Sequence, residues 1–210
     1  MTRDEIFAKV VEIVKPFVKS EDALAAVNSL KRGEIILHAT DTVWGLAADA
    51  TQPKAVRRLF ELKKRQPTLP LLMLASNEVM VETLLPDLPE EAWELMEISD
   101  RPVTVIAPGA NHCSRYDLSP EMKSADGQYA VRLTKDPYSA FIVKGLGKPV
   151  ASTSANLAGT PTPSNYGQID PIILAGVDYV GQYQRNNKGM SQASMMVQFD
   201  NAGRFQVIRG

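Results

Sequence analysis

The sequence has few of the residues that form covalent cross-links or resident metal sites. Its 210 residues include one cysteine, Cys113, and two histidines, His38 and His112. A single thiol excludes an intramolecular disulfide, and two histidines are too few for a histidine-rich metal site. We therefore expect a protein of a reducing compartment, the cytoplasm, with no metal ligands of its own.

The chain also lacks a large net charge and a long apolar run near its start. Its 23 basic and 24 acidic residues leave a formal net charge of -1, so no overall field draws it to nucleic acid or to an anionic membrane. Charged residues are scattered between Met1 and Val18, which excludes the apolar core of a signal peptide or membrane span there. Any anion site must be local, and we expect no membrane partner.

The composition suits one globular domain. Hydrophobic residues make up 44% of the chain, which is enough for a substantial core at this length. No internal repeat, low-complexity tract or shift in composition marks a linker. We expect a single domain over residues 1–210, with an N-terminal helix over residues 1–18 as an extension, since Thr2 and Glu5 form a capping-box pattern.

Hydrophobic periodicity predicts alternating helices and strands. Helices are expected at residues 2–16, 20–33, 53–66, 79–84, 89–98 and 137–146. Strands are expected at residues 34–38, 71–75, 103–107, 129–133, 149–151, 194–199 and 205–209, with polar loops at 109–127 and 152–164. Such alternation predicts an α/β or mixed α+β domain around a twisted sheet.

Four polar segments follow apolar strands or helices, where sheet-based sites are usually built. They are residues 39–46, residues 63–65, residues 152–156, and the pair Ser194 and Arg209. Each also has a simple structural explanation. Thr and Asp side chains stabilise turns, helix C-termini attract cations, and serine-rich loops are common. Taken one by one, these segments favour a structural role over a site.

In their order and spacing, the segments together resemble the signature of the YrdC/TsaC family of L-threonylcarbamoyladenylate synthases. The resemblance runs from about Ala23 to the end of the chain. It implies the family's fold, a twisted open sheet flanked by helices, with a large positively charged cavity. The stretches that carry it are Leu30-Lys-Arg-Gly33 with Ile35, Thr40-Asp-Thr-Val-Trp-Gly-Leu46, Lys63-x-Arg65 with Pro70-Leu71, Ala130-Val-Arg132, Ser152-Thr-Ser-Ala-Asn156 and Ile208-Arg209.

The resemblance implies an ATP-dependent nucleotidyltransferase. Family members condense L-threonine, bicarbonate or carbon dioxide, and ATP into threonylcarbamoyladenylate and pyrophosphate, the donor for N6-threonylcarbamoyladenosine in tRNA. Magnesium would accompany the ATP, and tRNA or threonylcarbamoyl-transfer proteins would be partners. Little covalent chemistry would fall to the protein, so positioning and cationic stabilisation of the phosphates should dominate.

The resemblance also assigns roles to single residues. Lys63 and Arg65 would grip the triphosphate and act as the catalytic cations. Arg132 would pair with the carboxylate of threonine, because a guanidinium meets a carboxylate in a bidentate way. The further ATP contacts would be Ser154, Asn156, Thr162 and Arg209, and the further threonine contacts would be Thr40 or Thr42, Ser152 and Ser194.

Some positions depart from the family pattern. Ala39 replaces a usual proline, and Trp44 replaces a usual tyrosine while keeping an aromatic wall. Leu69, Leu74 and Gln128 replace polar residues that contact substrate in some relatives. Two alternatives therefore stay open: a non-catalytic protein that binds nucleotide or double-stranded RNA, or a paralogue that activates another amino acid. The neutral net charge weighs against strong binding to duplex RNA.

Overall fold

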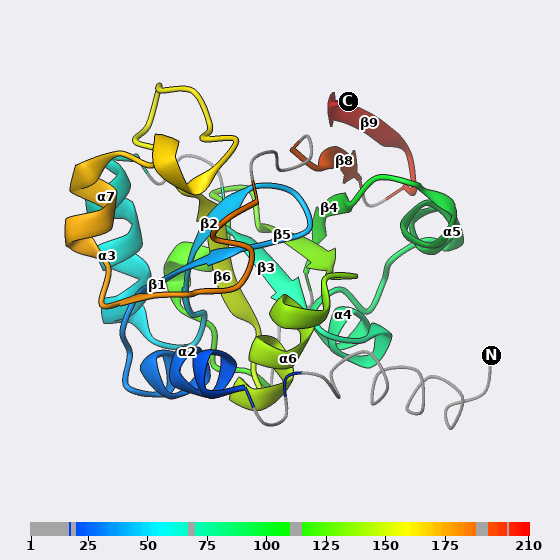
Figure 1. Cartoon of the computed structure of the whole chain (residues 1–210). Helices are drawn as coiled ribbons and strands as arrows, with labels where there is room; N and C mark the ends of the chain where they lie inside the picture. Colours follow the sequence, from blue (N-terminus) through cyan, green and yellow to red (C-terminus); the bar gives the residue numbers. More distant parts are fainter. Residues whose placement is uncertain (1–16, 18–19, 67–69, 110–114, 188–192, 201) are drawn as a thin grey trace.

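The computed structural model describes residues 17, 20–66, 70–109, 115–187, 193–200 and 202–210. The predicted helix over residues 2–16 lies outside these ranges, as do Leu69, His112 and Cys113. The described strands form one nine-stranded mixed sheet in the order β7-β1-β2-β6-β3-β5-β4-β8-β9. This twisted open sheet with flanking helices confirms the predicted fold class (Figure 1).

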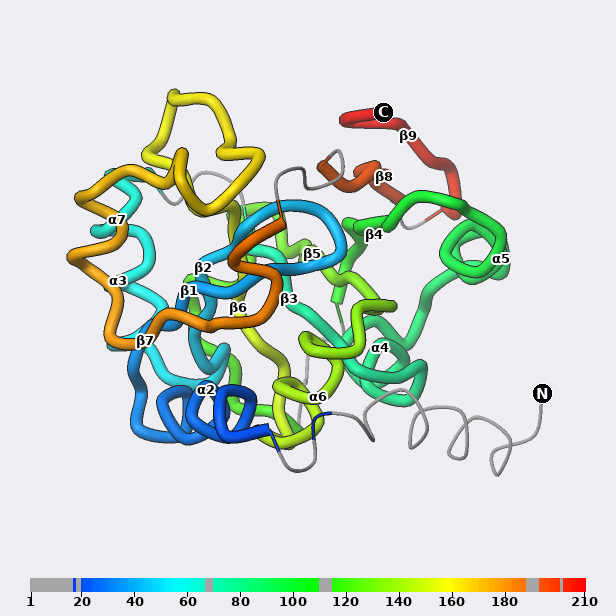
Figure 2. The backbone as a smooth tube through the Cα atoms, in the orientation of Figure 1, coloured from blue at the N-terminus to red at the C-terminus, as the bar shows by residue number. Residues whose placement is uncertain are grey.

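The strands of the sheet are short, and most are buried. Their bounds are β1 (Ile36–Ala39), β2 (Trp44–Asp49), β3 (Leu72–Ala75), β4 (Val103–Pro108), β5 (Gln128–Leu133), β6 (Val150–Ser154), β7 (Tyr179–Val180), β8 (Met195–Phe199) and β9 (Phe205–Arg209). Strand β7 comes late in the sequence, yet it pairs in parallel with β1 from the first part of the chain (Figure 2). At the other end of the sheet, β9 is an edge strand that pairs only with β8 among the described strands.

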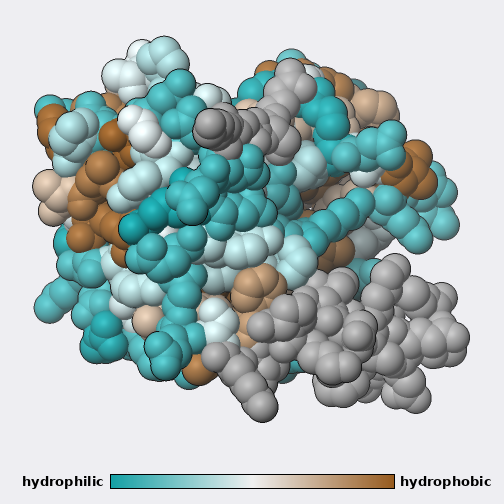
Figure 3. All heavy atoms as spheres, viewed as in Figure 1, coloured by the Kyte–Doolittle hydropathy of each residue, from teal (hydrophilic) through white to brown (hydrophobic). Residues whose placement is uncertain are grey.

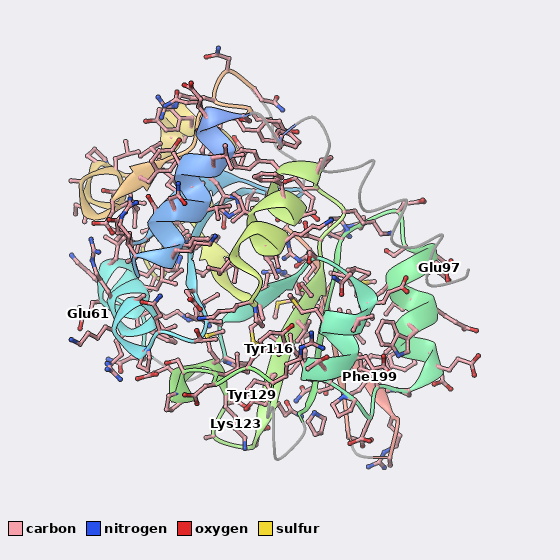
Figure 4. All side chains as sticks on the ribbon, turned by 90° about the horizontal axis from the view of Figure 1, so that it is seen from below. Glu61, Glu97, Tyr116, Lys123, Tyr129 and Phe199 are labelled. Carbon is pink, nitrogen blue, oxygen red and sulfur yellow. The ribbon has the colours of Figure 1, made fainter. Side chains whose placement is uncertain are left out.

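The helices flank the sheet, with α2 and α6 below it in Figure 1, α3 and α7 on the left, and α4 and α5 on the right. Their bounds are α2 (Glu21–Lys31), α3 (Pro53–Lys63), α4 (Glu78–Leu84), α5 (Glu90–Ile98), α6 (Pro137–Leu146) and α7 (Pro171–Gly176). Helices α2 and α6 lie side by side, as Figure 4 shows from below. In the same view the labelled Tyr116, Lys123 and Tyr129 gather near the start of β5. Apolar atoms show on the surface where α7 packs beside α3 (Figure 3).

Local signals in the sequence explain where most helices begin. The side chain of Ser20 accepts a hydrogen bond from the backbone N–H of Ala23 and so caps α2, which satisfies one of the donors at a helix N-terminus. Gly33, with a φ of +78°, follows the end of α2. The predicted helix at residues 20–33 is confirmed. Helix α3 ends at Lys63, before the expected residue 66, because Lys64 adopts the left-handed conformation with a φ of 52°.

Two segments near the site differ from the prediction. Trp44–Asp49, whose first three residues belong to the polar segment 39–46, is the fully buried strand β2, which pairs with both β1 and β6. Its Gly-Leu-Ala-Ala stretch has no β-branched residue, so local propensity did not indicate a strand. Strand β6 continues through Ser154, whereas residues 152–154 were expected in a loop. The short elements α7 and β7 were also not predicted.

No helix in the described ranges has the length and apolar character needed to cross a membrane.

Candidate functional site

A cavity of about 500 Å³ opens on one face of the sheet. Its lining includes three arginines, Arg65, Arg132 and Arg209, and, among the residues that the structure describes, one acidic side chain, Asp126. The cavity is therefore positively charged, as the resemblance implied. Its volume is in the range of sites for small molecules.

Small side chains on this face of the sheet make room for the cavity. Gly45 of β2 pairs in register with Ser154 of β6, and Ser152 and Ala130 lie on the strands on either side of Leu72. A Cβ atom added at Gly45 would lie 3.3 Å from Thr40 Cγ2. The absence of a side chain at Gly45 thus keeps this end of the cavity open.

A β-bulge turns two residues of β9 towards the cavity. Met196 of β8 pairs with Arg209, and the next residue, Val197, pairs with Val207. Ile208 is therefore the extra residue of the bulge, and both Ile208 and Arg209 line the cavity. Bulges often re-aim side chains beside a site in this way.

Arg132 donates hydrogen bonds to four side chains at the cavity wall. Its Nη1 donates to Asp41 Oδ1 at 3.2 Å and to Thr42 Oγ1 at 3.1 Å. Its Nε donates to Thr104 Oγ1 at 3.2 Å, and its Nη2 to Ser194 Oγ at 2.8 Å. Burial lowers the pKa of Arg132, and the charge of Asp41 opposes that shift. These contacts hold the guanidinium plane in one orientation at the cavity wall.

The hydroxyl groups around Arg132 form an ordered network. Thr40 Oγ1 donates its only proton to the carbonyl oxygen of Val43 at 2.7 Å. Thr42 must therefore be the donor in the 3.0 Å contact between the two threonine hydroxyls. On the other side, Ser194 Oγ contacts Thr104 Oγ1 at 3.0 Å. The threonine and serine side chains thus orient Arg132 as well as line the cavity.

Two further arginines hold the start of β8. Arg209 donates through Nε to the carbonyl oxygen of Ser194 at 3.0 Å and through Nη2 to Ser194 Oγ at 3.1 Å. Arg101 donates to the carbonyl oxygen of Ala193 at 3.1 Å. Three guanidinium groups therefore converge on residues 193–194, close to the carboxylate of Asp41. An anionic group of a ligand would be stabilised here.

A second polar group lies where β6 ends and α3 stops. Arg65, Ser154 and Thr162 line the cavity. Ser154 Oγ donates to Asn156 Oδ1 at 2.5 Å. Burial lowers the pKa of Arg65, and its guanidinium lies over the Phe60 ring, 5.9 Å from the ring centroid. A cation and two hydroxyls are suitable partners for phosphate oxygens.

Lys63 and Asn156 lie beneath this group and do not line the cavity. The Lys63 ammonium donates to the carbonyl oxygens of Ser154 and Asn156, the second at 2.6 Å. Asn156 Nδ2 donates to the carbonyl oxygens of Leu157 and Thr160 at 3.0 and 2.7 Å. Burial, with a contribution from the charge of Arg65, lowers the pKa of Lys63 to about 8. In this structure both residues shape the loop after β6.

All other predicted site residues line the one cavity. They come from segments far apart in the chain and are Thr40, Thr42, Arg65, Arg132, Ser152, Ser154, Thr162, Ser194 and Arg209. Residues that the sequence analysis did not assign are also present at the site. Thr104 and Gln198 line the cavity, and Asp41 pairs with Arg132. Thr104 and Gln198 lie in predicted strands, where only the side-chain alternation could have indicated their direction.

The departures from the family pattern have different structural outcomes. Trp44 is fully buried and packs on Tyr166, with ring centroids 5.2 Å apart, so the expectation that it forms a cavity wall was wrong. Leu74 is 1% exposed and belongs to the core. Gln128 does line the cavity. Within the described ranges, no three His, Cys, Asp or Glu side chains are grouped so as to hold a metal ion.

The fold and the cavity together define a class of protein: an α/β sheet with a cationic, hydroxyl-lined pocket for a small anionic ligand. Residues 28–210 match the Sua5/YciO/YrdC family model, described as "Telomere recombination". The chain belongs to this family. It is 34% identical over 162 residues to the threonylcarbamoyl-AMP synthase of Xanthomonas campestris pv. campestris (strain B100), a match that spans 76% of this chain and 84% of that relative.

Solved structures share the fold. A P. abyssi Sua5 structure in complex with L-threonine superposes with a TM-score of 0.75 and 23% identity, over 90% of this chain and 53% of that one. E. coli YciO superposes with a TM-score of 0.73 and 18% identity, over 89% of this chain and 87% of that one. The predicted family and its fold are confirmed.

Proposed function

We propose that this chain is a threonylcarbamoyl-AMP synthase that uses ATP, L-threonine and bicarbonate or carbon dioxide. The observation that carries this function is that nine of the predicted ATP and threonine residues, all except Lys63 and Asn156, line one cavity of about 500 Å³. The activity named for the Xanthomonas campestris relative supports it. A cavity of this size suits a nucleotide and an amino acid better than an RNA strand.

In the proposed reaction the amino group of threonine first combines with carbon dioxide to form a carbamate. A carbamate oxygen then attacks the α-phosphorus of ATP, the bond between that phosphorus and the α,β-bridging oxygen breaks, and pyrophosphate leaves. Arg65, with Ser154 and Thr162, would bind the phosphates. Arg132 would hold the threonine carboxylate, so that the two substrates lie side by side in the cavity.

Roles for other predicted residues follow from their positions. Arg209 reaches Ser194 between the two polar groups and would stabilise the negative charge of either substrate. Lys63 and Asn156 would act on the phosphates through the loop that they hold, and Thr40, Thr42 and Ser152 would position the amino acid. Magnesium would neutralise part of the triphosphate charge and would be bound mainly by the phosphates, since Asp126 is the single described carboxylate in the lining.

We also infer a single domain, because every described strand belongs to the same sheet. The product would be used in the cytoplasm, for N6-threonylcarbamoyladenosine in tRNA, either directly or through threonylcarbamoyl-transfer proteins.

Pyrophosphate release from ATP tests the proposal. We expect release that requires both L-threonine and bicarbonate, together with formation of threonylcarbamoyl-AMP. Release that requires a different amino acid would instead indicate a paralogue with another substrate. ATP binding with no release under any of these conditions would indicate a binding protein and would contradict the proposed activity.

A further inference from the structure

Thr134 is a buried residue directly after β5 that does not line the cavity. Its Oγ1 contacts Asp41 Oδ2 at 3.5 Å, and the threonine must be the donor, because an ionised carboxylate can only accept. Arg132 donates to the other oxygen of the same carboxylate, Oδ1. Two side chains from one segment therefore hold both oxygens of Asp41.

The sheet fixes the position of Thr134. Its N–H donates to the carbonyl oxygen of Ala75 at 3.0 Å, which extends the pairing of β5 with β3 by one residue beyond Leu133. Side chains two residues apart in an extended chain lie on the same side. Thr134 therefore shares its side with Arg132 and reaches the same carboxylate.

Asp41 belongs to a different part of the sheet. It lies in the segment between β1 and β2, and the order of the strands places β6 and β3 between β2 and β5. The backbone ladder therefore does not join the segment of Asp41 directly to that of Arg132. The link is made by side chains, and Thr134 is one of them.

Asp136 directs the hydroxyl of Thr134. Its N–H donates to Thr134 Oγ1 at 3.2 Å, so the hydroxyl accepts there and keeps its proton for Asp41. The Asp136 carboxylate in turn accepts from the N–H of Ser139 at 2.7 Å and caps α6. Burial raises the pKa of Asp136 to about 6, and the charge of Asp41 adds to the rise. The two carboxylates are therefore close enough to interact across Thr134.

A local turn explains only part of this arrangement. Threonine hydroxyls often accept from the N–H two residues later and so stabilise a turn. That role needs an acceptor oxygen alone. The donation from Thr134 to Asp41, 93 residues earlier in the chain, is a separate contact that the turn does not require.

We propose that Thr134 is a positioning residue for the amino-acid substrate, because it orients the carboxylate of Asp41 and through it the guanidinium of Arg132. This inference rests on the proposed function, since it takes L-threonine as the ligand of Arg132. The 3.5 Å contact is long for a hydrogen bond between two oxygens, and Arg132 keeps its bonds to other side chains. The expected effect on the reaction is therefore modest.

The test measures the KM for threonine and the KM for ATP in the pyrophosphate-release assay. Thr134→Val keeps the size and branching of the side chain but has no hydroxyl, and Thr134→Ser keeps the hydroxyl. The matched control is Thr83→Val, because Thr83 Oγ1 donates to the carbonyl oxygen of Val79 within α4 at 2.7 Å and Thr83 does not line the cavity.

In Thr134→Val we expect the KM for threonine to rise about fivefold, the equivalent of one hydrogen bond, while the KM for ATP stays within about twofold. Thr134→Ser and Thr83→Val should keep the native values. An equal rise in both KM values for Thr134→Val would indicate a general loss of structure and would overturn the inference.

A double variant shows whether Thr134 acts through Asp41. Asp41→Ala alone should raise the KM for threonine at least as much as Thr134→Val does. Adding Thr134→Val to Asp41→Ala should change this KM by no more than about twofold, because no carboxylate is left to orient. A KM for threonine that stays native in Asp41→Ala, or a full fivefold effect of Thr134→Val in the double variant, would refute the inference.

The inference and the proposed function fail in different ways. If the native chain releases pyrophosphate in response to threonine and Thr134→Val keeps the native KM, the positioning role is refuted and the proposed function stands. If the native chain releases no pyrophosphate in response to threonine, the proposed function is refuted and the inference with it.

Discussion

The ion pair between Arg132 and Asp41 gives the sharpest prediction about the site. Their side chains are 7% and 11% exposed and join through a 3.2 Å contact. Replacing Arg132 by Met would leave the carboxylate of Asp41 with little access to water. Breaking a buried pair in this way costs about 3–5 kcal/mol of the free energy of unfolding. The double variant Arg132→Met/Asp41→Asn removes both charges and should recover about 2 kcal/mol of that loss.

Urea unfolding, followed by tryptophan fluorescence, measures these stabilities. The matched control is the pair Arg57 and Glu121, whose contact is 2.8 Å but whose side chains are 53% and 20% exposed. Arg57→Met should cost at most about 1 kcal/mol, because water screens an exposed pair. If the losses of unfolding free energy caused by Arg132→Met and by Asp41→Asn simply add up in the double variant, the energetic coupling between the two side chains is refuted.

The same double variant separates stability from binding. With the charge of Asp41 removed as well, the chain should fold, but the charge-assisted hydrogen bonds to the threonine carboxylate would be lost. That loss is about 3 kcal/mol, or roughly 100-fold in the KM for threonine in the pyrophosphate-release assay. A folded double variant with an unchanged KM would contradict the role proposed for Arg132.

Three further predictions concern the supports of the site and the fold. Burial lowers the pKa of Lys63 to about 8 from its ordinary 10.5, so between these pH values the unfolded chain binds more protons than the folded chain, and the free energy of unfolding should rise with pH. Lys63→Met should remove this rise in urea titrations. A rise that persists in the variant would contradict the assignment to Lys63. Ser20→Ala should lower the free energy of unfolding by about 1 kcal/mol through loss of the α2 cap, with turnover unchanged; a lost turnover would contradict a purely structural role. Asn156→Ala removes the hydrogen bond to the carbonyl oxygen of Thr160 and should raise the KM for ATP about tenfold while the KM for threonine changes little; equal effects on both would refute its assignment to the phosphate side.

Local patterns in the sequence predicted most of the helices because their signals are local. Ser20 caps the N-terminus of α2, Gly33 follows its C-terminus, and α6 begins at Pro137. Strand β2 escaped prediction, because what stabilises it is pairing with β1 and β6 rather than the propensity of its own residues. The end of β6 was missed for the same reason. Its serines pair with Gly45 and Ala47, about a hundred residues earlier.

The site was predictable in its composition and less so in its geometry. The order of the motifs indicated Arg65, Arg132 and Arg209, and all three reach the cavity. The sequence could not show that the Lys63 ammonium is directed at the backbone of β6, since the two segments are 91 residues apart. Nor could it show that Gln128 meets Gln198, because the sheet places β4 between their strands.

A crystal structure with L-threonine and a non-hydrolysable ATP analogue tests the central claim most directly, namely that one cavity holds both substrates side by side. We predict the triphosphate against Arg65 and Ser154 and the threonine carboxylate at Arg132. A nucleotide bound elsewhere on the surface, or an amino acid bound away from Arg132, would contradict the account.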